Sequence, residues 1–247
     1  MPKFFIKPNQ IQENKITILG EDVKHITQVL RAKPQEELAV CNEDDGLNYL
    51  VKIENITLDS ILCQIVDCMK TFVEPPIDVT IFQGLPKADK MEYIIQKNVE
   101  LGVKEIIPVT MERCIVKLEE KNANKKIERW QKIAESAAKQ SGRDYIPKVK
   151  MPITIQELSK SIKNFDLVLL AYENEKENTL KQELKKIKPL QGVKIGIIIG
   201  PEGGITQKEV DLLVSQGAKI ITLGKRILRT ETASIMVMSN IIYEYEM

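Results

Sequence analysis

The sequence predicts an α/β protein with a small β-rich N-terminal domain and a larger domain that has a mainly parallel sheet with helices on both faces. Two observations support this. Short β-favouring runs separated by turn signals fill the chain up to about residue 70, whereas apolar strand-like runs alternate with helical patterns after residue 77. Between the two patterns, Pro75 and Pro76 break both periodicities. We place the domain boundary there, which gives domains 1–72 and 73–247.

The N-terminal domain is expected to form a small β-barrel interrupted by one helix. The helix is indicated by the helical spacing of Val23, Ile26, Val29 and Leu30. The sequence Asp44-Asp45-Gly46 suits a hairpin turn, because Asp and Gly tolerate the positive φ of tight connections. Strands are expected over residues 3–6, 15–19, 37–41, 47–53 and 61–66.

The larger domain is expected to alternate strands and helices. The run at residues 193–199 is isoleucine-rich, as central parallel strands buried on both faces usually are. Thr206 and Glu209 fit a capping box that starts a helix, and Gly217 fits its end. Strands are expected over residues 77–82, 105–110, 167–171, 193–199 and 220–223, and helices over 89–101, 124–141, 175–187, 206–216 and 234–244.

Two glycine-containing loops follow the last two strands, and they are the strongest functional signal. The first is IGPEGG at residues 199–204, where Gly200, Gly203 and Gly204 allow positive φ and close approach of a ligand. A phosphate site is disfavoured, because Glu202 would repel an anion and neither a P-loop nor a dinucleotide motif is present. A neutral or cationic ligand fits better, although the loop alone could also be a simple strand-to-helix turn.

The second loop is LGKRILRTETA at residues 223–233. Loops that leave adjacent carboxyl ends of parallel strands form the usual ligand crevice of an open α/β sheet. The two loops are therefore expected to line one site.

In combination, these two loops resemble the signature of the ribosomal RNA small subunit methyltransferase E family, in the SPOUT class of knotted methyltransferases. The similarity extends over nearly the whole chain. It includes GLPK (84–87), DKME (89–92), KNVELG (97–102), Arg113, WQKIAESAAKQSGR (130–143) and HITQVLR (25–31). The resemblance implies methyl transfer from S-adenosylmethionine to N3 of a uridine in 16S ribosomal RNA of the small ribosomal subunit. It also implies a SPOUT-type trefoil knot and a PUA-like, RNA-binding N-terminal barrel.

The resemblance also implies a set of cofactor-binding residues, in which backbone groups meet the adenine and aliphatic side chains form apolar walls. A side chain at Gly200 or Gly224 would fill space that the nucleoside needs. The implied S-adenosylmethionine-binding residues are Leu170, Ile199, Gly200, Pro201, Gly203, Leu223, Gly224, Ile227 and Leu228.

The chemistry of uridine assigns the expected catalytic roles. The N3 atom carries a weakly acidic proton, so it attacks poorly until that proton is lost or the resulting anion is stabilised. Arg229 is expected to stabilise the negative charge, because its guanidinium stays ionised and can hold an oxygen. Glu231 is a candidate base or orienting group, and Glu202 is a weaker candidate.

By resemblance, the RNA-binding positions are His25, Arg31, Lys87, Arg113, Gln140 and Arg143, with Ser141 beside them. His25 could equally be a surface or packing residue. Trp130 could stack on a base, but its neighbours on a helix favour packing. Residues 83–150 hold 15 Lys and Arg against 10 Asp and Glu, a net of +5, which suits an RNA partner but also suits a solvated helix face.

Composition excludes several other classes of protein. No apolar stretch has the length needed to span a bilayer, and the N-terminus lacks a signal-like apolar region, so a cytoplasmic protein is expected. The four cysteines contain no C-x-x-C pair and there is one histidine, so we expect buried free thiols and no metal. The apolar stripe of the last helix, Ile235, Met238, Ile241 and Ile242, indicates core or a dimer interface, and a homodimer is expected.

Two other functions stay open on the sequence. One keeps the SPOUT fold but methylates a ribose 2′-oxygen in tRNA or rRNA. The other is an RNA-binding protein that uses both domains without catalysis.

Overall fold

A computed structural model of the 247-residue chain describes residues 3–71, 73–116, 120–188, 190 and 192–247. The chain divides into two compact units. Unit 1 contains Met1–Glu74 together with Ala138–Ile146, and unit 2 contains Pro75–Ala137 and Pro147–Met247. The end of a long helix and the residues directly after it therefore belong to the N-terminal unit.

Unit 1 is built on a sheet in the order β1-β4-β5-β6-β3-β2. β1 pairs with β4 in parallel, and the remaining neighbours are antiparallel. Alternate side chains such as Phe4, Ile16, Val40 and Ile53 point into its apolar core. The strands are β1 (Lys3–Ile6), β2 (Ile11–Gln12), β3 (Lys15–Leu19), β4 (Glu37–Asn42), β5 (Asn48–Ile56) and β6 (Ser60–Met69).

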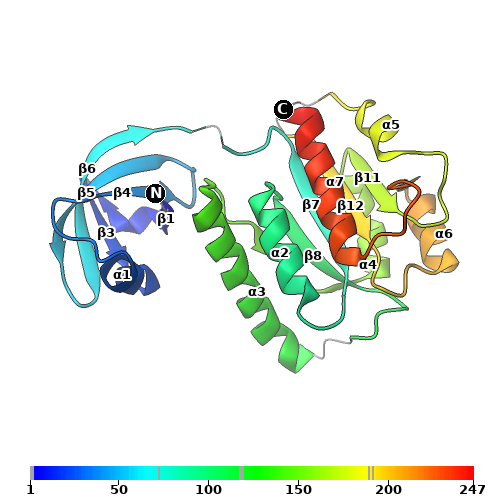
Figure 1. Ribbon diagram of the computed structural model, residues 1–247, viewed down its shortest axis with the longest axis horizontal. Coiled ribbons are helices and arrows are strands. Elements are labelled where there is room, and N and C mark those ends of the chain that lie inside the picture. Colours follow the sequence, from blue (N-terminus) through cyan, green and yellow to red (C-terminus); the bar gives the residue numbers. More distant parts are fainter. Residues whose placement is uncertain (1–2, 72, 117–119, 189, 191) are drawn as a thin grey trace. The chain divides into compact units, whose positions relative to one another are not determined.

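The expected barrel is a curled sheet, visible at the N-terminal end of the chain in Figure 1. Within the described residues, β1 and β2 are its two edges and do not pair with each other. The predicted hairpin is confirmed: β4 and β5 are antiparallel, and Gly46 adopts φ 68° between them. The predicted helix is a four-residue α1 (Glu21–Lys24) continued by a π-helical turn (His25–Val29).

The segment Ala138–Ile146 is joined to unit 1 through Asp144. Its buried carboxylate forms an ion pair with Lys3 and accepts hydrogen bonds from Asn48 (2.8 Å) and from Thr71. The backbone N–H of Asp144 donates to Glu74 (2.9 Å), which also receives the guanidinium of Arg143.

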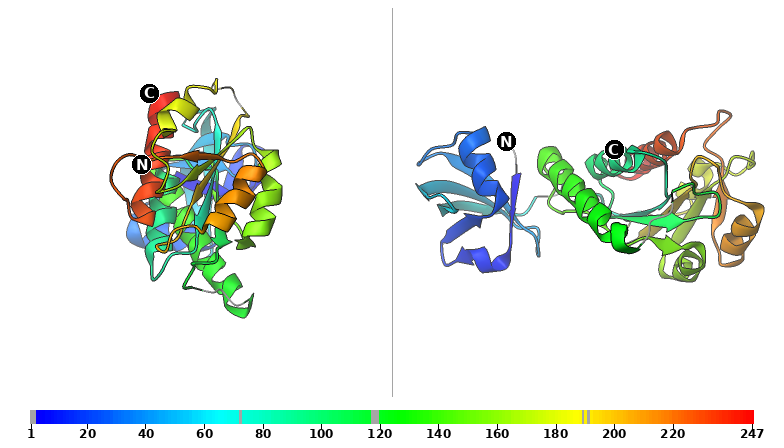
Figure 2. Two further views of the ribbon diagram at one scale, coloured as in Figure 1. Left: turned by 90° about the vertical axis from the view of Figure 1, so that its right-hand side faces the viewer. Right: turned by 90° about the horizontal axis from the view of Figure 1, so that it is seen from below.

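Unit 2 is a parallel sheet in the order β10-β8-β7-β12-β11-β13, with β9 paired to β8. Each of these pairings is parallel, which confirms the predicted sheet. Helices cover both faces: Figure 2 shows α2 and α7 on one side, and α4 and α6 on the other. The strands are β7 (Asp78–Gly84), β8 (Glu105–Thr110), β9 (Lys148–Val149), β10 (Ile153–Thr154), β11 (Leu167–Ala171), β12 (Lys194–Ile199) and β13 (Lys219–Ile221).

Several helices differ from the sequence prediction. The helix expected at 175–187 is wrong over its first half, because α5 runs only over Leu180–Leu184. The last helix starts at Thr230, four residues before its predicted start, and α4 with β9 and β10 was not predicted. The helices of this unit are α2 (Lys90–Glu100), α3 (Glu120–Ser141, ending in unit 1), α4 (Ile155–Ser161), α5, α6 (Gln207–Ser215) and α7 (Thr230–Tyr245).

The apolar stripe of α7 is mostly core. Met238, Ile241 and Ile242 are buried, and α7 packs beside α2 in Figure 1. Trp130 is buried as well, in agreement with the packing alternative. Three of the four free cysteines are buried as expected, but Cys68 is exposed.

Candidate functional site

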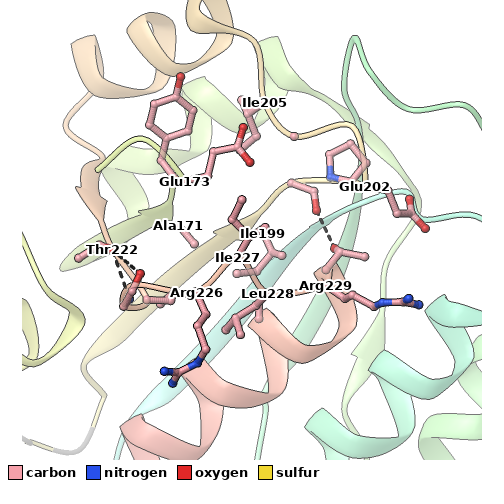
Figure 3. A pocket seen from close by; sticks show the side chains of 18 of the residues that line it. Ala171, Glu173, Ile199, Glu202, Ile205, Thr222, Arg226, Ile227, Leu228 and Arg229 are labelled. Carbon is pink, nitrogen blue, oxygen red and sulfur yellow. Dashed lines mark hydrogen bonds between the residues drawn. The ribbon is translucent and has the colours of Figure 1, made fainter. Parts of the chain in front are cut away.

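A pocket of about 430 Å³ lies at the carboxyl ends of β11, β12 and β13 (Figure 3). Ala171 ends β11, Ile199 ends β12 and Thr222 directly follows β13, and all three residues line the pocket. Since neighbouring strands are parallel, their ends and the loops that follow them meet at one edge of the sheet. The two glycine-containing loops therefore share one site, as the sequence predicts.

A chain of hydrogen bonds connects the first loop to the start of α7. The side chain of Gln83, at the end of β7, donates to the hydroxyl of Thr230 (2.8 Å). That hydroxyl donates to the carbonyl of Gly200 (2.6 Å). Gly84 lies against the same loop, because a Cβ atom there would sit 2.6 Å from the backbone nitrogen of Pro201. These contacts hold the end of β7, the first loop and the start of α7 together.

The glycines of the first loop serve packing more than the predicted positive φ. Of the three, only Gly204 has a positive φ (73°). A Cβ at Gly200 would lie 2.8 Å from Cγ1 of Ile205, and a Cβ at Gly203 would lie 3.0 Å from Cβ of Arg113. Packing against Ile205 alone therefore requires glycine at position 200, and the expectation that a side chain there would also fill ligand space stays a prediction.

The second loop forms the opposite wall of the pocket. Gly224 adopts φ 111°, and a Cβ there would meet only open space, so its conformation is what requires glycine. Its N–H donates to the Thr222 hydroxyl (3.2 Å), which holds the turn. In Figure 3, Arg226 and Arg229 extend in different directions from this loop. Ile227 is 86% exposed, an apolar side chain that a bound ligand could cover.

The predicted cofactor residues largely gather at this pocket. Leu170 is fully buried in β11 and Gly203 faces Arg113, and neither belongs to the lining. Sequence reasoning missed Glu173, whose carboxylate Figure 3 shows at the pocket beside Ile205. The predicted residues that line the pocket are Ile199, Gly200, Pro201, Leu223, Gly224, Ile227 and Leu228.

The predicted catalytic residues lie at the start of α7. Arg229 is its N-cap residue and lines the pocket. Glu231, in the first turn, is not part of the lining, but it forms an ion pair with Lys90 (3.5 Å). Lys90, which does line the pocket, also pairs with Glu202 (2.8 Å) and was not predicted as a site residue. The signal was available, because Lys90 lies in the quoted DKME segment.

Lys90 and Glu202 shift each other's pKa values. The hydrogen bond to Glu202 is the main cause that raises the pKa of Lys90, and the charge of Glu231 adds to it. For Glu202, burial raises the pKa, but hydrogen bonds from Lys90 and from backbone N–H groups, including that of Lys87 (3.1 Å), outweigh burial and lower the pKa. The lysine is therefore an ammonium and Glu202 a carboxylate at neutral pH.

The predicted RNA-binding residues fall in both units. In unit 2, Lys87 and Arg113 are exposed, and Arg113 donates to the carbonyl of Gly203 (3.0 Å), next to the pocket loop. In unit 1, His25, Arg31 and Gln140 are exposed, with the His25 ring edge-on to Phe4.

Arg143 does not support the RNA-binding prediction. It is 3% exposed, and its guanidinium pairs with Glu74. The structure therefore gives this side chain a role inside unit 1.

The chain matches two family models, an RNA methyltransferase domain over residues 73–242 and an RNA methyltransferase PUA domain over residues 18–66. It is 38% identical over 255 aligned positions to the ribosomal RNA small subunit methyltransferase E of Bacillus subtilis, with 100% of this chain and 98% of that protein covered. The chain belongs to the ribosomal RNA small subunit methyltransferase E family.

Solved structures agree with membership of the methyltransferase E family. The Neisseria gonorrhoeae methyltransferase E bound to S-adenosyl methionine is 31% identical, with a TM-score of 0.85 and coverage of 99% of this chain and 98% of that one. A putative methyltransferase from Legionella pneumophila in complex with the same cofactor is 29% identical, with a TM-score of 0.86 and coverage of 98% and 97%.

Proposed function

We propose that this protein methylates N3 of a uridine in 16S ribosomal RNA of the small ribosomal subunit, with S-adenosylmethionine as the methyl donor. Membership of the methyltransferase E family supports the reaction, and two structural relatives hold this cofactor. The observation that carries the proposal is the pocket at the carboxyl ends of β11, β12 and β13, formed by two glycine-containing loops.

The pocket fits the chemistry of the cofactor. Its volume of about 430 Å³ lies within the roughly 300–1,000 Å³ typical of small-molecule sites. Ile199, Ile205 and Leu228 supply apolar walls, and the open space beside Gly224 leaves backbone groups of the second loop accessible. Glu173 adds a carboxylate that suits hydroxyl or ammonium groups. We assign cofactor binding to the seven predicted residues that line the pocket, and leave Leu170 and Gly203 out.

When bound, S-adenosylmethionine supplies an electrophilic methyl group on a sulfonium centre. The chain must hold the uracil ring so that N3 faces that group, because in-line positioning provides much of the rate in such transfers. Arg229, which lines the pocket, is the proposed stabiliser of negative charge on the uracil oxygens. Glu231, in the first turn of α7, is the proposed acceptor of the N3 proton. His25, Arg31, Lys87, Arg113 and Gln140 are the proposed RNA contacts.

The test is methyl transfer from tritiated S-adenosylmethionine to small subunits that lack the modification, followed by nucleoside identification by mass spectrometry. We expect label in N3-methyluridine. Label in a ribose 2′-O-methyl nucleoside would instead support the alternative SPOUT activity. No label, together with RNA binding that Arg229→Ala leaves unchanged, would support the non-catalytic alternative.

Three further properties belong to this proposal. Family membership supports the trefoil knot and a homodimer, although the buried stripe of α7 no longer argues for the dimer. The ribosomal substrate supports a cytoplasmic location, and among the described residues no helix is long and apolar enough to cross a membrane. Light scattering at micromolar concentration tests the dimer, which a monomeric mass would contradict.

A further inference from the structure

Lys90 occupies the junction of three segments at the pocket. It is the first residue of α2, it pairs with Glu202 of the first loop (2.8 Å), and it pairs with Glu231 in the first turn of α7 (3.5 Å). Glu202 also accepts the backbone N–H of Lys87 (3.1 Å). The ammonium of Lys90 thus connects the start of α2 with both segments that define the edge of the pocket.

The charge of the Glu231 carboxylate is compensated by this lysine. Its Oε2 atom is buried and accepts no hydrogen bond from the described residues, and the ammonium of Lys90 is the cation that faces it. A buried acceptor without a hydrogen bond is unfavourable, and more so when it is charged. The pairing therefore compensates a carboxylate that unit 2 holds in an otherwise unfavourable place.

Without the lysine, two carboxylates would face one another. Oxygens of Glu202 and Glu231 both lie within 4 Å of the Lys90 nitrogen, and like charges at such separations favour the protonated acid. The other charged groups that line the pocket are Glu173, Lys225, Arg226 and Arg229. Of the groups at the pocket, Glu202 and Glu231 are the ones that act on Lys90 directly.

We propose that Lys90 is a positioning residue for methyl transfer, which holds the carboxylates of Glu202 and Glu231 in place at the pocket edge so that Glu231 can accept the uridine N3 proton. This rests on the proposed function, because it assigns the lysine to the same reaction. In that reaction a bond forms between N3 and the methyl carbon, the bond from that carbon to sulfur breaks, and its electron pair stays on sulfur. The N3 proton goes to the Glu231 carboxylate and from there to water.

The experiment compares Lys90→Met and Lys90→Arg in single-turnover methylation of unmethylated small subunits between pH 5.5 and 9. The arginine retains the charge, whereas methionine retains the apolar stem without it. Lys97→Met is the matched control, because Lys97 pairs with Glu100 on the same helix and does not line the pocket. Cofactor affinity is measured by calorimetry and folding by thermal unfolding, and Lys90→Gln serves as a second uncharged variant.

We expect both uncharged variants to lower the methylation rate constant at pH 6.5 by at least about tenfold, while the Kd for S-adenosylmethionine changes by less than about threefold. A loss of this size corresponds to about 1.4 kcal/mol. Removal of the cation leaves two neighbouring carboxylates without their shared counterion, which favours the protonated acid, so the acidic limb of the pH–rate profile moves to higher pH. Lys90→Arg should restore that limb, and Lys97→Met should match the wild type.

An unchanged acidic limb in a folded uncharged variant would overturn the proposal, as would a rate loss fully explained by weaker cofactor binding. An equal loss in Lys90→Arg would also overturn it. Failure of the proposed function looks different, because the wild-type protein would then place no methyl group on uridine N3.

Discussion

Glycines around the pocket are required for different physical reasons. Gly224 is held at a positive φ in open space, whereas Gly84 has ordinary φ but no room for a side chain. In the sequence both are glycines that follow an apolar strand. Substitutions at the two positions should therefore fail by different routes, the first through backbone strain and the second through steric overlap.

Gly84→Ala should destabilise unit 2 and weaken cofactor binding together. The added Cβ would sit 2.6 Å from both the nitrogen and Cδ of Pro201, and backbone atoms cannot move aside as a flexible side chain can. Overpacking of this kind typically destabilises by about 1–3 kcal/mol. Denaturant unfolding with and without S-adenosylmethionine measures both effects. Ala88→Gly is the control, since Ala88 is exposed at φ 52° and should tolerate glycine. Wild-type stability of Gly84→Ala would contradict the close contact.

Glu173→Gln should weaken S-adenosylmethionine binding about tenfold with little change in stability. The Glu173 carboxylate lines the pocket and is exposed, and a hydrogen bond to a charged group contributes about 1.5–3 kcal/mol. Calorimetry with the cofactor measures the Kd. Glu177→Gln, an exposed change in the following loop, should leave it unaltered. An unchanged Kd for Glu173→Gln would show that this carboxylate faces solvent in the complex.

At the scale of elements, local hydrogen bonding explains the main failure of the sequence prediction. Glu175 does not start a helix, because its carboxylate accepts the backbone N–H groups of Lys176, Glu177 and Asn178 and forms a turn. The helix starts after Thr179, whose hydroxyl accepts from Gln182 N–H in a capping box. That box was readable in the sequence, as the equivalent one at Thr206 was. The competing turn was not, because a glutamate gives no turn signal of its own.

The end of α3 shows a different limit of prediction from the sequence. Periodicity predicted a helix to residue 141, and the helix does end at Ser141. It could not show that residues 138–146 join unit 1, because that depends on contacts between Asp144 and residues more than 70 positions away. The same limit applies to Lys90, whose partners, in the first loop and in the first turn of α7, are distant in sequence.

Asp144→Ala should destabilise unit 1 selectively. The substitution leaves Lys3, Asn48 and Thr71 without their shared partner in a buried place, and loss of one member of a buried ion pair is unfavourable by about 3–5 kcal/mol. Amide hydrogen exchange should show faster exchange in β1 and β5, while β12 keeps its protection. Asp59→Ala, at an exposed turn of the same unit, should change stability by less than about 0.5 kcal/mol. Uniform loss of protection across both units would contradict the selectivity.

At the scale of the molecule, the division into units separates the proposed RNA contacts of unit 1 from the pocket of unit 2. The sequence predicted the parallel sheet and the two loops that supply much of the pocket lining, because the positions of strands and loops along the chain follow from local patterns. It did not predict which polar side chains reach the pocket edge. Arg143 illustrates this limit, since a basic residue in a basic segment is buried against Glu74.

Because Arg31 and the pocket lie in different units, we expect Arg31 to affect the binding of RNA and not the chemical step. This exposed arginine, held at φ 55° after the π-helical turn, is a proposed RNA contact of unit 1 and takes no part in the pocket lining. Arg31→Ala should therefore raise the KM for small subunits several-fold, while kcat and the Kd for S-adenosylmethionine stay unchanged. If the guanidinium binds a phosphate, the slope of log K for RNA against log salt should fall by roughly one. Lys7→Ala, an exposed cation elsewhere in unit 1, is the control. A drop in kcat at saturating RNA would contradict this separation. It would mean that unit 1 also positions the uridine for the chemical step.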